Sequence, residues 1–127
     1  MKPALLIIDV QKDFYQISPA TAQSLTQAIE YINAAITLFR RKGLPIVCIQ
    51  HMNPNDNLVP GASGFDLPED LDILPSDVRI HKCYGNAFNK TPLLEQLREQ
   101  GSIPSSSQVF APNIVCCLPI VGPKTWI

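Results

Sequence analysis

Three apolar runs in this 127-residue chain each end in polar residues, and the types of these residues could support hydrolytic chemistry. Asp9 ends the run A-L-L-I-I, Gln50-His51 end the run P-I-V-C-I-Q, and Lys82 follows the short run Val78-Arg79-Ile80. A carboxylate and an ammonium that come together each favour the charged form of the other, and the carboxylate can then accept a proton from a nucleophile. Asp9 and Lys82 are therefore our candidate catalytic residues.

The apolar runs also predict the elements that position these residues. Residues 4–8 are continuously apolar, which is typical of a central parallel strand buried on both faces. Between Pro19 and Lys42, apolar residues alternate at spacings of four and three, which predicts one amphipathic helix ending before Gly43. The apolar positions are Leu25, Ile29, Ile32, Ile36 and Phe39. Residues 45–50 form the next apolar run, so the order strand, helix, strand predicts a right-handed βαβ unit.

The next segment, residues 52–75, is rich in Asn, Asp, Pro and Gly and has no period, which indicates a long loop that forms a lid or pocket wall. A short third strand is expected at residues 78–80. Thr91 should then cap a helix with Pro92 at its first position, with a buried face reaching Gly101. We predict an α/β, Rossmann-like three-layer fold with a parallel sheet. In such folds the carboxyl ends of the strands gather the catalytic groups.

Composition excludes several classes of function. The chain is 46% hydrophobic and 17% charged with a formal net charge of -1, which indicates one soluble globular domain without a basic patch for nucleic acid. Its apolar runs are far shorter than the roughly 20 residues of a membrane-spanning helix. The start of the chain lacks the small-residue cleavage site of a signal peptide, and none of the four cysteines has C-x-x-C spacing. We expect a cytoplasmic protein with reduced thiols and no membrane partner.

Two motifs give the chain a specific resemblance. The segment Asp9 to Phe14, D-V-Q-K-D-F, matches the D-x-Q-x-x-F opening of the isochorismatase-like cysteine hydrolases, and Lys82 to Phe88 resembles their K-x-x-x-x-A-F segment. The Gln50-His51 strand end, the loop P-G-x-x-G-F-D-L-P-E and the helix T-P-L-L-E-Q-L extend the likeness, which covers roughly residues 1–101. The ordered set is more specific than any one of its members. We therefore expect residues 1–101 to be the amino-terminal part of such a hydrolase domain.

This resemblance implies a mechanism. A cysteine thiolate attacks an amide or related carbonyl, and water then hydrolyses the thioester. The substrate implied for the family is a small amide, urea-like or vinyl-ether compound. Asp9 would be the general base, and Lys82 would orient the pair and stabilise the thiolate. Gln11 and Phe14 would shape the substrate pocket, although a packing role is equally open for both. The resemblance suggests a homo-oligomer, and the only ligand expected is the small-molecule substrate, with no cofactor.

The positions of particular residues in the expected strands argue against a metal site and against Cys48 and Cys83 as nucleophiles. The nicotinamidase branch of the family uses an Asp-x-His pair at the second strand end, but here Ile49 occupies the Asp position before His51, so we expect no metal. We interpret Cys48 as a core residue and Cys83 as a loop residue, because neither lies at the end of a fourth strand, where the resemblance places the nucleophile.

The last segment, residues 102–127, departs from the family pattern, which continues with an apolar strand, a cysteine turn and a helix. Read one base out of frame, Pro104 to Ser107 would encode three consecutive apolar residues, because the common Ser codons begin with T-C. A cysteine could then arise across the codons of Ile114 and Val115. Our leading explanation is a base lost at the Gly101 codon. The alternative is a natural divergent tail with Cys116 or Cys117 as the nucleophile.

Two function hypotheses and one structural expectation follow. The chain is either a hydrolase with an Asp-Lys-Cys triad or a catalytically silent, truncated fragment or binding remnant without a nucleophile. Because no strand pattern is recognisable after the third strand, we expect the sheet to be incomplete there. That would leave residues 4–8 as an exposed apolar edge prone to aggregation.

Overall fold

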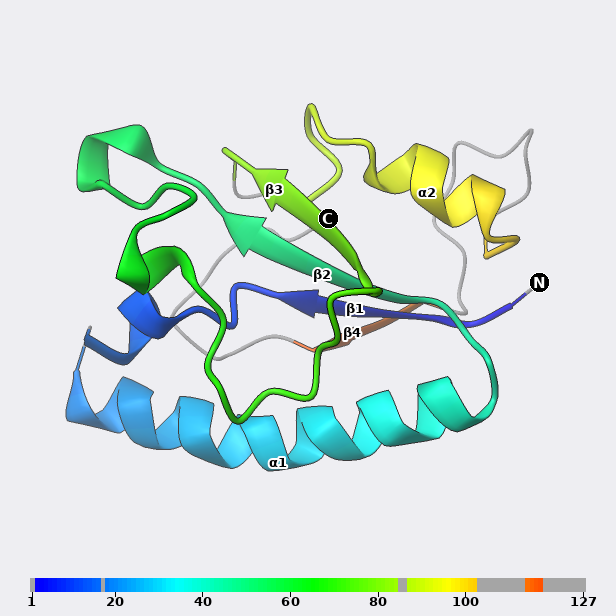
Figure 1. Cartoon of the computed structure of the whole chain (residues 1–127), viewed down its shortest axis with the longest axis horizontal. Helices are drawn as coiled ribbons and strands as arrows, with labels where there is room; N and C mark the ends of the chain where they lie inside the picture. Colours follow the sequence, from blue (N-terminus) through cyan, green and yellow to red (C-terminus); the bar gives the residue numbers. More distant parts are fainter. Residues whose placement is uncertain (1, 17, 85–86, 103–113, 118–127) are drawn as a thin grey trace.

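In the computed structural model, four parallel strands form one sheet with a helix on each face (Figure 1). The structure describes residues 2–16, 18–84, 87–102 and 114–117, and only the backbone of Phe14, Tyr15 and residues 114–117. The main elements are β1 (Ala4–Ile8), α1 (Pro19–Arg41), β2 (Ile46–His51), β3 (Val78–Lys82), α2 (Leu93–Glu99) and β4 (Ile114–Cys117). The sheet order is β3-β2-β1-β4. This confirms the predicted α/β class with a parallel sheet.

Strand β1 is one of the two inner strands of the sheet, as its unbroken apolar run predicts. All five of its residues are fully buried, and its parallel register pairs Leu5 with Ile46 of β2. Strand β2 begins and ends one residue later than predicted, so His51 belongs to the strand. Strand β3 extends two residues beyond the expected Ile80 and includes Lys82. Lys82 is therefore held by strand backbone rather than by a loop.

The expectation of a sheet that stops after its third strand, with residues 4–8 as an exposed edge, is wrong. Ile114–Cys117 form β4, which pairs in parallel with β1 and places Ala4 opposite Ile114. A buried strand that lacked a neighbour on one side would leave backbone N–H and C=O groups without partners, which is costly. The apolar segment I-V-C-C, rich in residues that favour strands, satisfies them.

Helix α1 forms where its apolar period predicts. The side chain of Ser18 caps its N-terminus by accepting a hydrogen bond from the Thr21 N–H at 3.0 Å. Gly43, with a φ of 67°, allows the Leu44 N–H to reach the Phe39 carbonyl at 2.9 Å and closes the helix with a Schellman motif. The predicted apolar positions Leu25, Ile29, Ile32, Ile36 and Phe39 are all buried. None of the described helices is both long and apolar enough to cross a membrane.

Helix α2 covers the opposite face of the sheet (Figure 1). Leu93 and Leu97 are fully buried and pack into the cluster that contains Leu6, Ile8 and Ile80 of the strands. The predicted cap is displaced by one residue, because the helix begins at Leu93 and Pro92 occupies the cap position. The Thr91 hydroxyl still accepts from the N–H of Leu93, at 3.4 Å, and donates to the carbonyl of Ala87 at 2.5 Å.

The segment between β2 and β3, residues 52–77, crosses the α1 side of the sheet without a helix of its own. It contains only two short 3-10 turns, Pro54–Asp56 and Ser63–Phe65. Asn33 of α1 donates to the Asp70 carbonyl at 2.8 Å and accepts from the Asp72 N–H at 2.9 Å. The predicted long loop is therefore tied to the helix by side-chain contacts. We call residues 52–77 the crossover loop.

A second tie joins Arg40 of α1 to Asp77. The guanidinium donates to both carboxylate oxygens of Asp77, at 2.9 and 3.0 Å, and to the Asp72 carbonyl at 3.1 Å. Burial raises the pKa of Asp77, but the Arg40 hydrogen bond, the Leu74 N–H and nearby positive charge outweigh burial, so the pKa is lowered overall. The carboxylate form of Asp77 is thus favoured in the folded chain.

We expect Asp77→Asn to reduce the free energy of unfolding at neutral pH by about 1 kcal/mol, because the Arg40 side chain is 35% exposed and partly screened. The folded pKa lies below the unfolded value of about 3.9, so the stabilisation is present above that value and is lost as the pH falls through the folded pKa. Urea unfolding as a function of pH should show this acid loss in the wild type and less of it in Asp77→Asn. Asp70→Asn, which removes an exposed carboxylate in the same loop, is the matched control, and an equal effect of both variants would contradict the role of Arg40.

Candidate active site

Asp9 and Lys82, the predicted catalytic residues, form a buried ion pair. Asp9 follows β1 and Lys82 ends β3, and β2 lies between these two strands in the sheet. The Lys82 Nζ lies 3.4 Å from the Asp9 Oδ1, and the side chains are 1% and 0% exposed. The same Nζ donates to the Tyr84 carbonyl at 3.2 Å. The carboxyl ends of the parallel strands thus bring the two candidates together as the sequence predicts.

The backbone of Asp9 turns sharply out of the sheet. Its N–H still donates to the Ile49 carbonyl at 3.0 Å, which continues the ladder between β1 and β2. Its φ is 61°, in the left-handed region that side chains other than those of Gly, Asn and Asp rarely adopt. Left-handed non-glycine residues cluster at functional sites, where the surrounding structure holds them in place. Here the turn carries the carboxylate to Lys82.

Gln11 fastens the turn after β1 to the end of β2. Its Nε2 donates to the carbonyls of His51 and Phe65, at 3.0 and 3.1 Å, and its Oε1 accepts from the His51 N–H at 2.7 Å. The side chain is fully buried. Because these backbone groups use both ends of the amide, the arrangement shows the packing role that the sequence left open. A contact between Gln11 and substrate stays a prediction.

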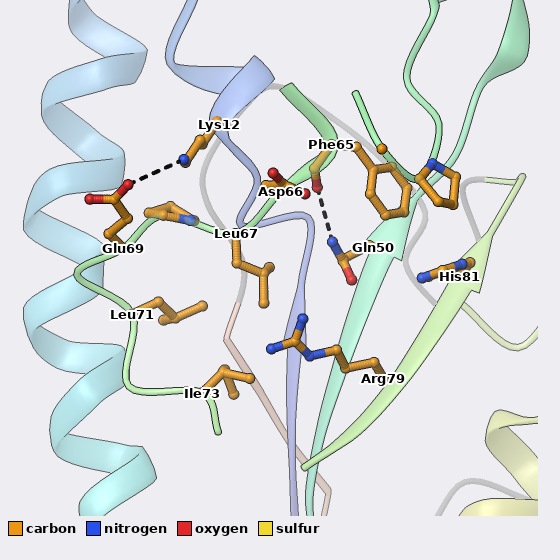
Figure 2. A pocket seen from close by; sticks show the side chains of 13 residues that line it. Lys12, Gln50, Phe65, Asp66, Leu67, Glu69, Leu71, Ile73, Arg79 and His81 are labelled. Carbon is orange, nitrogen blue, oxygen red and sulfur yellow. Dashed lines mark hydrogen bonds and ion pairs between the residues drawn. The ribbon is translucent and has the colours of Figure 1, made fainter. Parts of the chain in front are cut away.

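Phe65 of the crossover loop is the point at which the loop meets the strand ends. Its carbonyl accepts from Gln11 and also from the Gln50 Nε2 at 2.9 Å (Figure 2). Its ring packs edge to face against His81 with a centroid distance of 5.0 Å. A Cβ at Gly64 would lie 2.9 Å from the Asp13 carboxylate, so a side chain there would force the loop away. Local sequence gives no signal that a backbone carbonyl at position 65 accepts two buried amides.

The other predicted substrate-binding residue, Phe14, is described only in its backbone. It lies in the 3-10 turn η1 (Lys12–Gln16), which the Lys12 N–H joins to the Asp66 carbonyl at 2.9 Å. The side chain of Phe14 is outside the described part of the chain, and its pocket role stays a prediction.

The cysteines differ in whether they could act as nucleophiles. Cys48 is buried in β2, and burial raises the pKa of its thiol to about 12 in spite of the nearby Arg79 charge, which fits a core residue. Cys83 is exposed. The backbone register places Cys116 opposite Leu6 and Cys117 opposite Ile7. Cys117 therefore lies two residues before the level of Asp9, roughly 7 Å along the strand.

The residues at the end of β2 do not fit the Asp-x-His metal pair. Ile49 is fully buried in the apolar cluster on the α2 side of the sheet, where an Asp would be needed. Within the described part of the chain, no three side chains of His, Cys, Asp or Glu gather into a metal-binding group.

Comparison with known proteins decides the family. The family model described as the isochorismatase domain matches residues 3–103, which include every site residue above except Cys116 and Cys117. The chain belongs to the isochorismatase family. The isochorismatase-family match thus contains Asp9, Gln11, Phe14 and Lys82, the residues singled out from the sequence.

Individual isochorismatase relatives are similar in sequence and in structure. The chain is 28% identical to the isochorismatase family protein YddQ of Bacillus subtilis, over 80% of this chain and 58% of the relative, and 32% identical to YrdC of the same organism, over 76% and 52%. The crystal structure of N-carbamoylsarcosine amidase from Thermoplasma acidophilum is 25% identical with a TM-score of 0.68, over 80% of this chain and 63% of that one. The chain therefore spans little more than half the length of the curated relatives it matches.

We expect Gln11→Glu to lower the free energy of unfolding by about 2–4 kcal/mol. The glutamate cannot donate to the His51 and Phe65 carbonyls, and it places a buried charge against them. The measurement is urea unfolding followed by circular dichroism. Gln16→Glu, an exposed change at the end of the 3-10 turn that follows Gln11, is the control and should stay within about 0.5 kcal/mol of the wild type. A loss below about 1 kcal/mol for Gln11→Glu would show that Gln11 does not hold the turn.

Proposed function

We propose that the chain carries the Asp-Lys part of a cysteine-hydrolase site of the isochorismatase family. The observation that carries this proposal is the ion pair between Asp9 and Lys82, which is fully buried at the carboxyl ends of parallel strands. An ion pair that only stabilises the fold gains little from burial, because desolvation of two charges can exceed their attraction. A buried ion pair at the carboxyl ends of parallel strands is instead explained by a role in proton transfer during catalysis.

The proposed chemistry has two steps. The Asp9 carboxylate takes the proton of a cysteine thiol, the thiolate attacks the substrate carbonyl, and the leaving amine takes the proton back, which forms a thioester. Asp9 then takes a proton from water, the hydroxide attacks the thioester, and the proton returns to the sulfur as the acid leaves. Lys82 holds the carboxylate in position and stabilises the thiolate by its charge. Backbone N–H groups at the nucleophile turn would stabilise the oxyanion.

We propose a small amide or urea-like compound as the substrate class, with a vinyl ether as the alternative. The similarity to N-carbamoylsarcosine amidase supports the first class, because the name of that enzyme describes hydrolysis of an N-carbamoyl compound, which contains a urea-like carbonyl. Gln11 and Gln50 hold the crossover loop at the strand ends, which supports a small substrate bordered by that loop. We propose no cofactor.

The second candidate function is a catalytically silent remnant, and the register of β4 favours it for the chain as written. A nucleophile must come within hydrogen-bond reach of its base. Cys117 lies opposite Ile7, two residues before Asp9. Cys48 is excluded by the raised pKa of its buried thiol. The two functions therefore differ in whether any remaining thiol is activated.

Thiol reactivity separates these candidates. If the site is active, iodoacetamide should trap one of Cys83, Cys116 and Cys117 with a pH midpoint well below the roughly 8.5 of a free thiol. Lys82→Met should raise that midpoint by about one pH unit or more, because a nearby cation favours the thiolate. Peptide mapping by mass spectrometry identifies the residue.

Lys42→Met, which removes an exposed ammonium at the end of α1, is the matched control and should leave the midpoint unchanged. Circular dichroism verifies that Lys82→Met remains folded. Slow labelling of every accessible cysteine with an ordinary midpoint would support the silent remnant and contradict the hydrolase.

We propose that the atypical tail, residues 102–127, arises from one base lost at the Gly101 codon. Sequencing the gene should show that one added base turns the codons of Pro104 to Ser107 into three apolar residues and creates a cysteine across the codons of Ile114 and Val115. An immediate stop codon in that frame, or codons that spell neither the apolar strand nor the cysteine, would refute the shift. Cys116 would then return as the candidate nucleophile.

The frame-restored chain gives the test of Asp9. We expect it to release ammonia from a small N-carbamoyl amide, and we expect Asp9→Asn to remove nearly all turnover with little change of fold, since one charge is lost at constant shape. Lys82→Arg should also fail, because a planar guanidinium does not replace the compact ammonium. Retained turnover in Asp9→Asn would exclude it as the general base.

A further inference from the structure

The two faces of strand β3 carry different kinds of side chain. Successive side chains of a strand point to opposite faces, so Ile80 and Lys82 belong to one face and Arg79 and His81 to the other. Ile80 packs with α2 in the apolar cluster, and Lys82 is buried beside Asp9. Arg79 and His81 are exposed. The face of β3 opposite the Asp9–Lys82 pair therefore carries a cation and an imidazole over an edge strand.

The crossover loop covers this face of β3 but leaves a cavity between itself and the strands. A cavity of about 510 Å³ lies between the loop and strands β2 and β3, and its polar floor includes Gln50, Arg79 and His81 (Figure 2). Its opposite wall is apolar and includes Leu67, Leu71 and Ile73 of the loop. A cavity of this size, apolar on one side with a few polar groups on the other, is typical of small-molecule sites. We call it the crossover cleft.

Arg79 lines this cleft with a charged side chain. In Figure 2 its side chain reaches across β2, and the guanidinium lies among Gln50, Leu67 and Ile73. Among the described residues, no hydrogen bond or ion pair engages that guanidinium, although its charge helps to lower the pKa of Asp77. Three other charged side chains line the cleft: Lys12 of η1, and Asp66 and Glu69 of the loop. Lys12 and Glu69 lie 3.7 Å apart and offset each other. The Asp66 carboxylate is exposed.

We propose that the crossover cleft binds a small organic carboxylate with an apolar body, which is a second site apart from Asp9 and Lys82. The planar guanidinium of Arg79 offers paired N–H donors that match a carboxylate. The leucine and isoleucine side chains of the loop would cover the apolar body, and Phe65 and His81, in edge-to-face contact, also line the cleft. The cleft opens on the α1 side of the sheet, whereas Lys82 extends toward the α2 side.

Binding of benzoate to the isotopically labelled wild-type chain, followed by amide chemical shifts in NMR spectra, tests this site without any turnover. We expect saturable shifts at residues 66–73 and 79–81 in the roughly millimolar range or tighter. Benzyl alcohol, which has the same ring but no charge, should bind at least about tenfold more weakly. Arg79→Gln should weaken benzoate binding to a similar extent, and Arg79→Lys should also weaken it because the fork is lost.

Two controls keep the outcomes distinct. Arg41→Gln removes an exposed guanidinium at the end of α1 and should leave benzoate binding unchanged. Asp9→Asn should also leave it unchanged, so the cleft can bind even if the hydrolase proposal fails. If Arg79→Gln loses its amide dispersion and is unfolded, Arg79→Lys provides the comparison. The proposal is overturned by the absence of saturation up to about 20 mM, by equal binding of benzyl alcohol, by full binding in both Arg79 variants, or by shifts centred on Asp9 and Lys82.

Discussion

The ion pair of Asp9 and Lys82 is the constraint on which the site depends, because both side chains are withdrawn from water. Desolvation of such a pair costs several kcal/mol for each ion, and only close geometry with additional hydrogen bonds recovers that cost. The Tyr84 carbonyl supplies one such bond to Lys82. The rest of the architecture can be understood as the means by which two charges 3.4 Å apart are kept in place.

The order of the strands makes this pairing feasible. Asp9 and Lys82 leave strands that are separated by β2, so each side chain must reach over the end of that strand. The left-handed turn at Asp9 directs one partner, and the two extra residues of β3 carry the other to the strand end. Gln11 and Gln50 then fix the loop above β2 by donating to the same Phe65 carbonyl. Three chain segments distant in sequence thus converge on one point.

The sequence predicted the elements whose signals are local. The four-and-three spacing from Leu25 to Phe39 predicted helix α1 almost to the residue, and the apolar run before Asp9 predicted β1 as a buried inner strand. The candidate pair followed from the rule that strand ends converge. The amide contacts of Gln11 could not be predicted, because their partners are backbone groups 40 and 54 residues away that leave no pattern. Strand β4 was missed because its four residues lie in a tail without recognisable periodicity.

The crossover loop lines the crossover cleft and is also hydrogen-bonded to Gln11, which follows Asp9 in the chain. A helix between β2 and β3 would cover the outer face of β3 with closely packed side chains, whereas an irregular segment tied down at Asn33 and Arg40 leaves space beneath it. That space is bounded by Gln50 and Phe65, the same residues whose hydrogen bond holds the loop at the strand ends. A molecule in the crossover cleft would therefore contact the residues that hold the loop at the strand ends. Gln11, two residues after Asp9, donates to the same Phe65 carbonyl, so this carbonyl joins the wall of the cleft to the turn that follows β1.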